Sequence, residues 1–155
     1  MQAEYTVLYG NADHAPIDVS EFTDPRGVFL IGYVDGIAAA MGGWRRHGDE
    51  HPDTAWAGSR AELKRMYVAP PFRAQGYSRT VLTELELSAR RAGVGWMLLE
   101  TGYMQPGAIA LYRSCGYDDV PAFGHYADTE LSVHLGRPLS DDAPPRPPVS
   151  SPTPS

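Results

Sequence analysis

Hydrophobic positions along the chain form short runs at some places and a helical repeat at others. Runs rich in β-forming residues predict strands. The Asp35-Gly36 pair between the second and third runs is a hairpin turn signal. Two further short strands are expected near the end of the chain. The expected strands cover Glu4–Tyr9, Val28–Val34, Ile37–Trp44, Ala61–Val68, Trp96–Leu99, Tyr117–Val120 and Leu131–Leu135.

The spacing of apolar residues becomes helical after residue 79. Leu82, Leu85 and Ala89 recur at helical intervals between charged positions, which predicts a helix over Arg79–Arg91. A proline in the first turn and a glycine after the last predict a second helix over Pro106–Ser114. A short helix is also expected around residues 17–22, inside a polar loop.

The arrangement of these elements predicts an α/β (α+β) fold. Trp96–Leu99 is apolar throughout, as expected for a strand whose two faces are both covered. Together with Ala61–Val68 and the helix between them it forms a βαβ unit with parallel strands. We therefore expect a mixed, mostly antiparallel sheet of six or seven strands, with a central parallel pair and flanking helices.

Composition sets the domain boundaries. The chain has 155 residues, 43% of them hydrophobic and 21% charged, which is ordinary for one globular domain. Half of its 14 prolines follow Arg137. Such a segment cannot bury much apolar surface, so we expect a domain over residues 1–137 and a disordered Pro/Ser-rich tail over residues 138–155.

Charge and cysteine content narrow the class of protein. A formal net charge of −6 disfavours a nucleic-acid partner. The first residues do not form a signal peptide and no apolar run reaches the length of a membrane span, so we expect a cytoplasmic protein without a membrane partner. Cys115 is the sole cysteine, which excludes an intrachain disulfide and a cysteine-based zinc cage, and we expect no metal. A monomer and a homodimer both remain open.

The loop between the Ala61–Val68 strand and the following helix is a candidate anion site. Backbone N–H groups at the start of a helix lack intrahelical acceptors and face its positive dipole end. Gly76 permits close approach of a ligand, and Arg73 and Arg79 add charge. Alternatively, Gly76 only shapes a turn and both arginines are solvated.

This segment resembles the acetyl-CoA-binding motif of the Gcn5-related N-acetyltransferases (GNAT family). That motif is a strand, V-x-P and then [QR]-x-x-G-x-[GA]; the chain has Val68, Pro70 and Arg73–Ser78, with serine where the family usually has glycine or alanine. The family's second signature, LYxxxGY, matches residues 111–117. The resemblance covers about residues 5 to 136.

The resemblance implies acetyl-CoA as co-substrate and a splayed central parallel pair that admits its pantetheine arm. The backbone of Met66 and Val68 is then expected to face the acetyl-pantetheine, and the amides of residues 75–78 to hold the pyrophosphate. The full set of residues expected to bind the co-substrate is Met66, Val68, Arg73, Ala74, Gln75, Gly76, Tyr77, Ser78 and Arg79.

The same resemblance suggests two catalytic residues. Tyr112 corresponds to a tyrosine that protonates the departing thiolate, and a phenol is protonated at neutral pH; the alternative is an ordinary core tyrosine. Glu62 is the candidate base that deprotonates an incoming amine. Alternatively Glu62 forms a salt bridge at the strand edge with Arg60 or Lys64. Glu100 is a rival base.

Four aromatic or imidazole side chains are candidates for acceptor binding: Trp44, Tyr103, His125 and Tyr126. The predicted function is acetyl transfer from acetyl-CoA to a primary amine of a small molecule by direct attack. Two alternatives remain: a non-catalytic acyl-CoA-binding sensor or partner module, and an acetyltransferase for protein N-termini or lysines.

Overall fold

The computed structural model describes residues 3–7, 22, 26–47, 59–121, 132–141 and 143. Seven strands form one sheet in the order β1-β2-β3-β4-β5-β7-β6. β4 and β5 are parallel and the other pairs are antiparallel, so the predicted mixed sheet is confirmed. The elements are β1 (Ala3–Val7), β2 (Gly27–Val34), β3 (Ile37–His47), β4 (Arg60–Val68), η2 (Pro70–Phe72), α1 (Tyr77–Arg91), β5 (Trp96–Gly102), α2 (Pro106–Ser114), β6 (Asp118–Asp119) and β7 (Ser132–Pro138).

Several elements extend beyond their predicted ends because neighbouring strands keep pairing. β3 continues past Trp44 to pair with the start of β4, and β5 continues past Leu99 to pair with β7 as far as Gly102. α1 begins two positions before Arg79. Apart from residue 22, the short helix expected at residues 17–22 lies outside the described residues.

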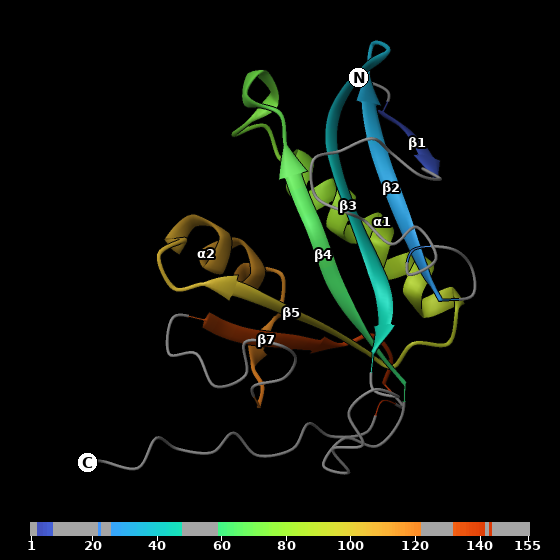
Figure 1. The fold of residues 1–155 in the computed structure, drawn as a ribbon, viewed down its shortest axis with the longest axis vertical. Helices are drawn as coiled ribbons and strands as arrows, with labels where there is room; N and C mark the ends of the chain where they lie inside the picture. The colour runs from blue at the N-terminus through green and yellow to red at the C-terminus, as the bar shows by residue number, and fades with distance from the viewer. Residues whose placement is uncertain are drawn as a thin grey trace.

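The α1 helix covers the face of the sheet formed by β2, β3 and β4 (Figure 1). Its buried apolar residues include Leu82 and Leu85, at the spacing predicted from sequence, and they share one core cluster with Leu63 of β4. Gly42 of β3 permits this close packing. A Cβ at that position would collide with the Met66 sulfur and lie 3.1 Å from Cδ1 of Leu85.

The central parallel pair separates soon after it begins. β4 pairs with β5 only over Arg60–Glu62, which faces Trp96–Leu98. Beyond this point β4 continues to pair with β3, and β5 with β7, so the two strands diverge into a V (Figure 1). The splay implied by the family resemblance is therefore present.

A bulge in β4 lies within the diverging part. Between the pairs Met41–Tyr67 and Gly43–Lys64, the single residue Gly42 of β3 opposes two residues of β4, Arg65 and Met66. Arg65 within this bulge has φ of 62°, a left-handed conformation that costs a non-glycine residue about 1–2 kcal/mol. A bulge bends its strand and increases the local twist, which favours the departure of β4 from β5.

A buried carboxylate connects α1 to the C-terminal part of the sheet. Glu86 accepts hydrogen bonds from Tyr117 Oη at 2.7 Å and from Arg137 Nη1 at 3.0 Å. Burial first, and Glu86 second, raise the pKa of Tyr117 well above its ordinary value, so the phenol stays protonated and donates. The three side chains thus join α1, the segment after α2 and β7.

The folded part of the chain continues past the predicted boundary at residue 137. Leu139 is 1% exposed and belongs to the main core cluster. Its N–H donates to the Gly95 carbonyl at 2.7 Å. Residues 144–155, most of the predicted tail, lie outside the described residues. No helix in the described part of the chain is both long and apolar enough to cross a bilayer.

Replacement of Glu86 by alanine is expected to lower the free energy of unfolding by about 3 kcal/mol, because it leaves the buried Tyr117 hydroxyl and the Arg137 guanidinium without their acceptor. Urea denaturation followed by circular dichroism measures this change. Glu84→Ala, in the same helix and without these contacts, is the control and should change stability by about 0.5 kcal/mol or less. Equal effects of the two substitutions would show that the network contributes nothing.

Candidate active site

The V between β4 and β5 contains a cleft of about 480 Å³. Both strands and α2 contribute to its walls. Its lining includes both candidate bases and the candidate acid. The lining residues are Arg45, Glu62, Leu63, Lys64, Arg65, Met66, Leu99, Glu100, Thr101, Gln105, Ala108 and Tyr112.

A second cleft, of about 430 Å³, extends toward the start of α1. It shares Met66, Gln105, Ala108 and Tyr112 with the first cleft, so the two adjoin at the splay. Three residues of the motif expected to bind the co-substrate, Val68, Arg73 and Ser78, lie in its wall. One continuous region therefore brings the candidate acid next to the candidate anion loop.

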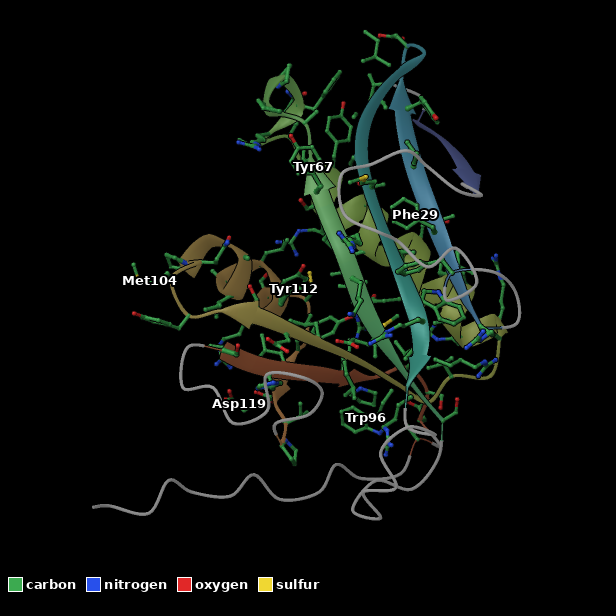
Figure 2. All side chains as sticks on the ribbon, viewed as in Figure 1. Phe29, Tyr67, Trp96, Met104, Tyr112 and Asp119 are labelled. Carbon is green, nitrogen blue, oxygen red and sulfur yellow. The ribbon has the colours of Figure 1, made fainter. Side chains whose placement is uncertain are left out.

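Tyr112 stands where the two clefts meet. α2 places it in the opening between β4 and β5, with 7% of its surface exposed (Figure 2). Its ring packs edge-on against Tyr117, with the centroids 5.8 Å apart. Burial, followed by the neighbouring Cys115, raises the pKa of Tyr112 to about 12. The phenol is therefore protonated across the physiological range and can donate a proton into the cleft.

Glu62 lies at the last paired position of β4 before the splay and is 7% exposed. Arg45, its pairing partner on β3, donates from Nη2 to Glu62 Oε1 at 3.2 Å. The salt bridge is thus made to Arg45, and neither Arg60 nor Lys64, the partners expected from sequence, forms it. Within the described part of the chain, Glu62 Oε2 accepts no hydrogen bond, which leaves that oxygen able to take a proton.

Glu100, the rival base, lies on the opposite wall of the cleft. Ser132 donates its hydroxyl to Glu100 Oε1 at 2.9 Å, and His134 Nε2 is 3.7 Å from Oε2. Both partners belong to β7, the strand that pairs with β5. Because both carboxylate oxygens of Glu100 face β7 side chains, Glu62 has the freer oxygen for proton transfer.

The loop before α1 has the backbone of an anion-binding turn. Gly76 occupies the N-terminal cap position with φ of 85°, and no side chain caps the helix. Ala74 is also left-handed, with φ of 62°. Arg73 donates to the Val68 carbonyl at 3.1 Å and lies 5.8 Å from the Tyr67 ring centroid, while Gln75 donates to the Pro71 carbonyl. These contacts fix the loop and leave the uncapped helix start open to an anion.

Two candidate residues make contacts that the sequence did not predict. Arg79, expected to contribute charge for the phosphates, donates to Ser114 Oγ at 2.9 Å and to Cys115 Sγ at 3.3 Å, so it links α1 to the end of α2. Trp44, expected in the acceptor pocket, is 1% exposed, and its indole donates to Ser88 of α1 at 2.8 Å. It points to the face that α1 covers and is a core residue.

The structure does not place the remaining acceptor candidates in the lining of either cleft. Tyr103 is 51% exposed in the turn after β5 and does not belong to the lining of either cleft. His125 and Tyr126 lie outside the described residues. The sequence reasoning missed Arg45, Lys64 and Arg65 as residues of the cleft; the adjacent cations Lys64 and Arg65, in the strand that carries Glu62, were the available signal for two of them.

Comparison with known proteins agrees with this geometry. The family model described as "Acetyltransferase (GNAT) family" matches residues 2–117, which is most of the chain and includes the splayed strands and the loop before α1. The chain belongs to the GNAT acetyltransferase family.

Three relatives of this GNAT chain show how far the similarity extends. An IAA acetyltransferase of Azospirillum brasilense is 43% identical over 82 residues, 53% of this chain and 54% of that protein, so the match spans about half the relative's length. A Klebsiella pneumoniae protein assigned as an acyl-CoA N-acyltransferase has a TM-score of 0.73 and 26% identity, over 89% of this chain and 98% of that one. A GNAT acetyltransferase of Elizabethkingia anophelis, solved with acetyl-CoA bound, has a TM-score of 0.60 and 16% identity, over 86% and 97% of the two chains.

The raised pKa of Tyr112 can be measured by titration. We expect the difference in ultraviolet absorbance between the wild-type GNAT protein and Tyr112→Phe to stay flat through pH 10 and to grow only toward pH 12, because burial disfavours the phenolate. Circular dichroism over the same range confirms that both proteins remain folded. A difference that rises around pH 10 would mean that the phenol is solvated.

Proposed function

We propose that this protein transfers the acetyl group of acetyl-CoA to an amine of a small molecule by direct attack. One observation carries the proposal: the splay between β4 and β5 opens a cleft whose lining includes both Glu62 and Tyr112. A candidate proton acceptor and a candidate proton donor therefore border the same space. The second cleft leads from Tyr112 to the loop before α1.

Acetyl-CoA fits the groups that border the second cleft. Its pantetheine arm would lie along the diverging part of β4, near Met66 and Val68, where β5 no longer pairs. Backbone groups in such a gap need a hydrogen-bond partner, and an amide-bearing arm supplies one. Its pyrophosphate would bind the uncapped start of α1, with the amides of residues 75–78 and the charge of Arg73.

The reaction requires proton transfers at the acceptor nitrogen and at the leaving sulfur. The ammonium form of the acceptor loses one proton to Glu62 Oε2, directly or through water, and its nitrogen attacks the thioester carbonyl carbon. As the new C–N bond forms and the C–S bond breaks, Tyr112 gives its proton to the departing thiolate. The nitrogen, cationic after the attack, loses its second proton to solvent, the phenol recovers a proton from solvent, and Glu62 releases the one it took. No covalent enzyme intermediate is needed.

A small acceptor is supported by the Azospirillum relative, which is named an IAA acetyltransferase. The match spans only about half of that protein, so the acceptor itself belongs to the proposal. The direct test incubates the purified protein with acetyl-CoA and a panel of small amines, follows thiol release and identifies the product by mass. If none of the amines caused thiol release above the rate without an amine, the proposal would be contradicted.

Tyr112→Phe is expected to lower kcat about 100-fold, because the thiolate then leaves without a proton donor. Binding of acetyl-CoA, measured by calorimetry, should change less than about two-fold, since the ring and its contact with Tyr117 are kept. Tyr33→Phe, on the distant strand β2, is the matched control. An unchanged kcat in Tyr112→Phe would remove this residue as the acid.

Glu62→Gln is expected to lower kcat/KM for the amine about 100-fold at neutral pH, where the acceptor arrives mostly as its ammonium form. The deficit should shrink as pH rises toward the pKa of the amine, because more acceptor is already deprotonated. A pH profile of both proteins measures this. Glu84→Gln on α1 is the control, and a deficit in Glu62→Gln that stays constant with pH would contradict the role of base.

A further inference from the structure

We propose that the acceptor carries a carboxylate beside its amine, and that Lys64 and Arg65 bind this carboxylate. The inference rests on the proposed function and names the class of its acceptor. It derives from the charges that border the first cleft, where Arg45, Lys64 and Arg65 stand against Glu62 and Glu100.

Some charged side chains of this cleft have a polar or charged partner, and others have no salt bridge among the described residues. Arg45 and Glu62 form a salt bridge. Glu100 accepts a hydrogen bond from Ser132 and lies beside His134. Lys64 and Arg65 form no salt bridge within the described part of the chain. Two cations therefore border the cleft without a salt bridge of their own to any described residue, in a chain whose formal net charge is −6. A local positive potential inside a cleft of an acidic protein attracts an anionic group of the ligand.

The bulge in β4 gives this pair its position. Adjacent residues of a regular strand point to opposite faces of the sheet. Lys64 still pairs with Gly43, but directly after it the register with β3 shifts and Arg65 adopts φ of 62°, so the regular alternation is broken between Lys64 and Arg65. Residues held in costly backbone conformations cluster at functional sites, and a bulge re-aims side chains there.

The order of groups along β4 fits a molecule with two charged ends. Glu62 and Lys64 are two positions apart on the strand, about 7 Å from Cα to Cα. An amine directed at Glu62 would thus leave an attached carboxylate within reach of the long Lys64 and Arg65 side chains. Arginine suits this task, since its guanidinium binds a carboxylate through two parallel hydrogen bonds.

The coenzyme phosphates are the other anions that could meet these cations. The loop before α1 and Arg73, however, border the second cleft, and neither Lys64 nor Arg65 does. The experiment must therefore measure acetyl-CoA and the acceptor separately.

The test compares matched acceptors: glycine, β-alanine and the aromatic amino acids, each beside its carboxamide. For each pair, kcat/KM is measured with saturating acetyl-CoA in the wild-type protein, Lys64→Met, Arg65→Gln and Arg65→Lys. For each variant, kcat/KM for the acid is divided by kcat/KM for the carboxamide, and this ratio is then divided by the same ratio in the wild-type protein. The division cancels the effect of the different amine pKa values of acid and carboxamide. We expect this quotient to fall about 10-fold in Arg65→Gln and in Lys64→Met, and less in Arg65→Lys, with the KM of acetyl-CoA unchanged.

Arg91→Gln is the control, because Arg91 is an exposed cation in the last turn of α1, away from the cleft. Calorimetric binding of the same acids and carboxamides to the protein with CoA gives a readout independent of turnover. A quotient near one, or a loss that falls on the KM of acetyl-CoA instead, would overturn the carboxylate assignment. Thiol release with other small amines but with none of these amino acids would also overturn the carboxylate assignment, whereas absence of thiol release with every amine would count against the proposed function.

Discussion

The structure depends on the point at which two parallel strands stop pairing. Buried N–H and C=O groups need partners, so a strand pair that separates inside a sheet exposes groups that either water or a ligand must satisfy. Here the separation begins directly after Glu62 on β4 and Leu98 on β5. The gap, both clefts and the position of the candidate acid and base follow from it, because each lies on or beside a strand segment that has lost one neighbour.

The rest of the molecule keeps the separation in place. α1 packs closely on β3 and β4, which is possible because Gly42 has no side chain to meet Met66 and Leu85. On the other arm, β5 is fully paired with β7. The Glu86 network joins α1 to β7, and therefore connects one arm of the V to the other through the core. The opening is thus built into well-packed elements and does not depend on a loop.

Sequence reasoning was strongest where the signal is local. The strands, the two helices and the loop around Gly76 could be read from periodicity, turn residues and short motifs, and Glu62 and Tyr112 were brought into one cleft as the motifs implied. Sequence reasoning was weaker where the outcome depends on distant partners. Trp44, expected in the acceptor pocket, instead pairs with Ser88 of α1 in the core, and Arg79 contacts residues at the end of α2; no local pattern specifies either contact. The register shift that places Lys64 and Arg65 beside the cleft likewise depends on how β3 aligns with β4.

The anchoring of Tyr112 differs from that of the cations on the bulge, and this difference bears on evolution. Tyr112 packs on Tyr117, which is bound to Glu86 in the interior, so loss of the ring at this position would disturb the core. Arg65 is exposed and makes no contact of that kind with the interior. If the bulge cations bind the acceptor as proposed, substitutions at exposed positions of one strand would change which acceptor is used, while the packing that supports Tyr112 stays intact.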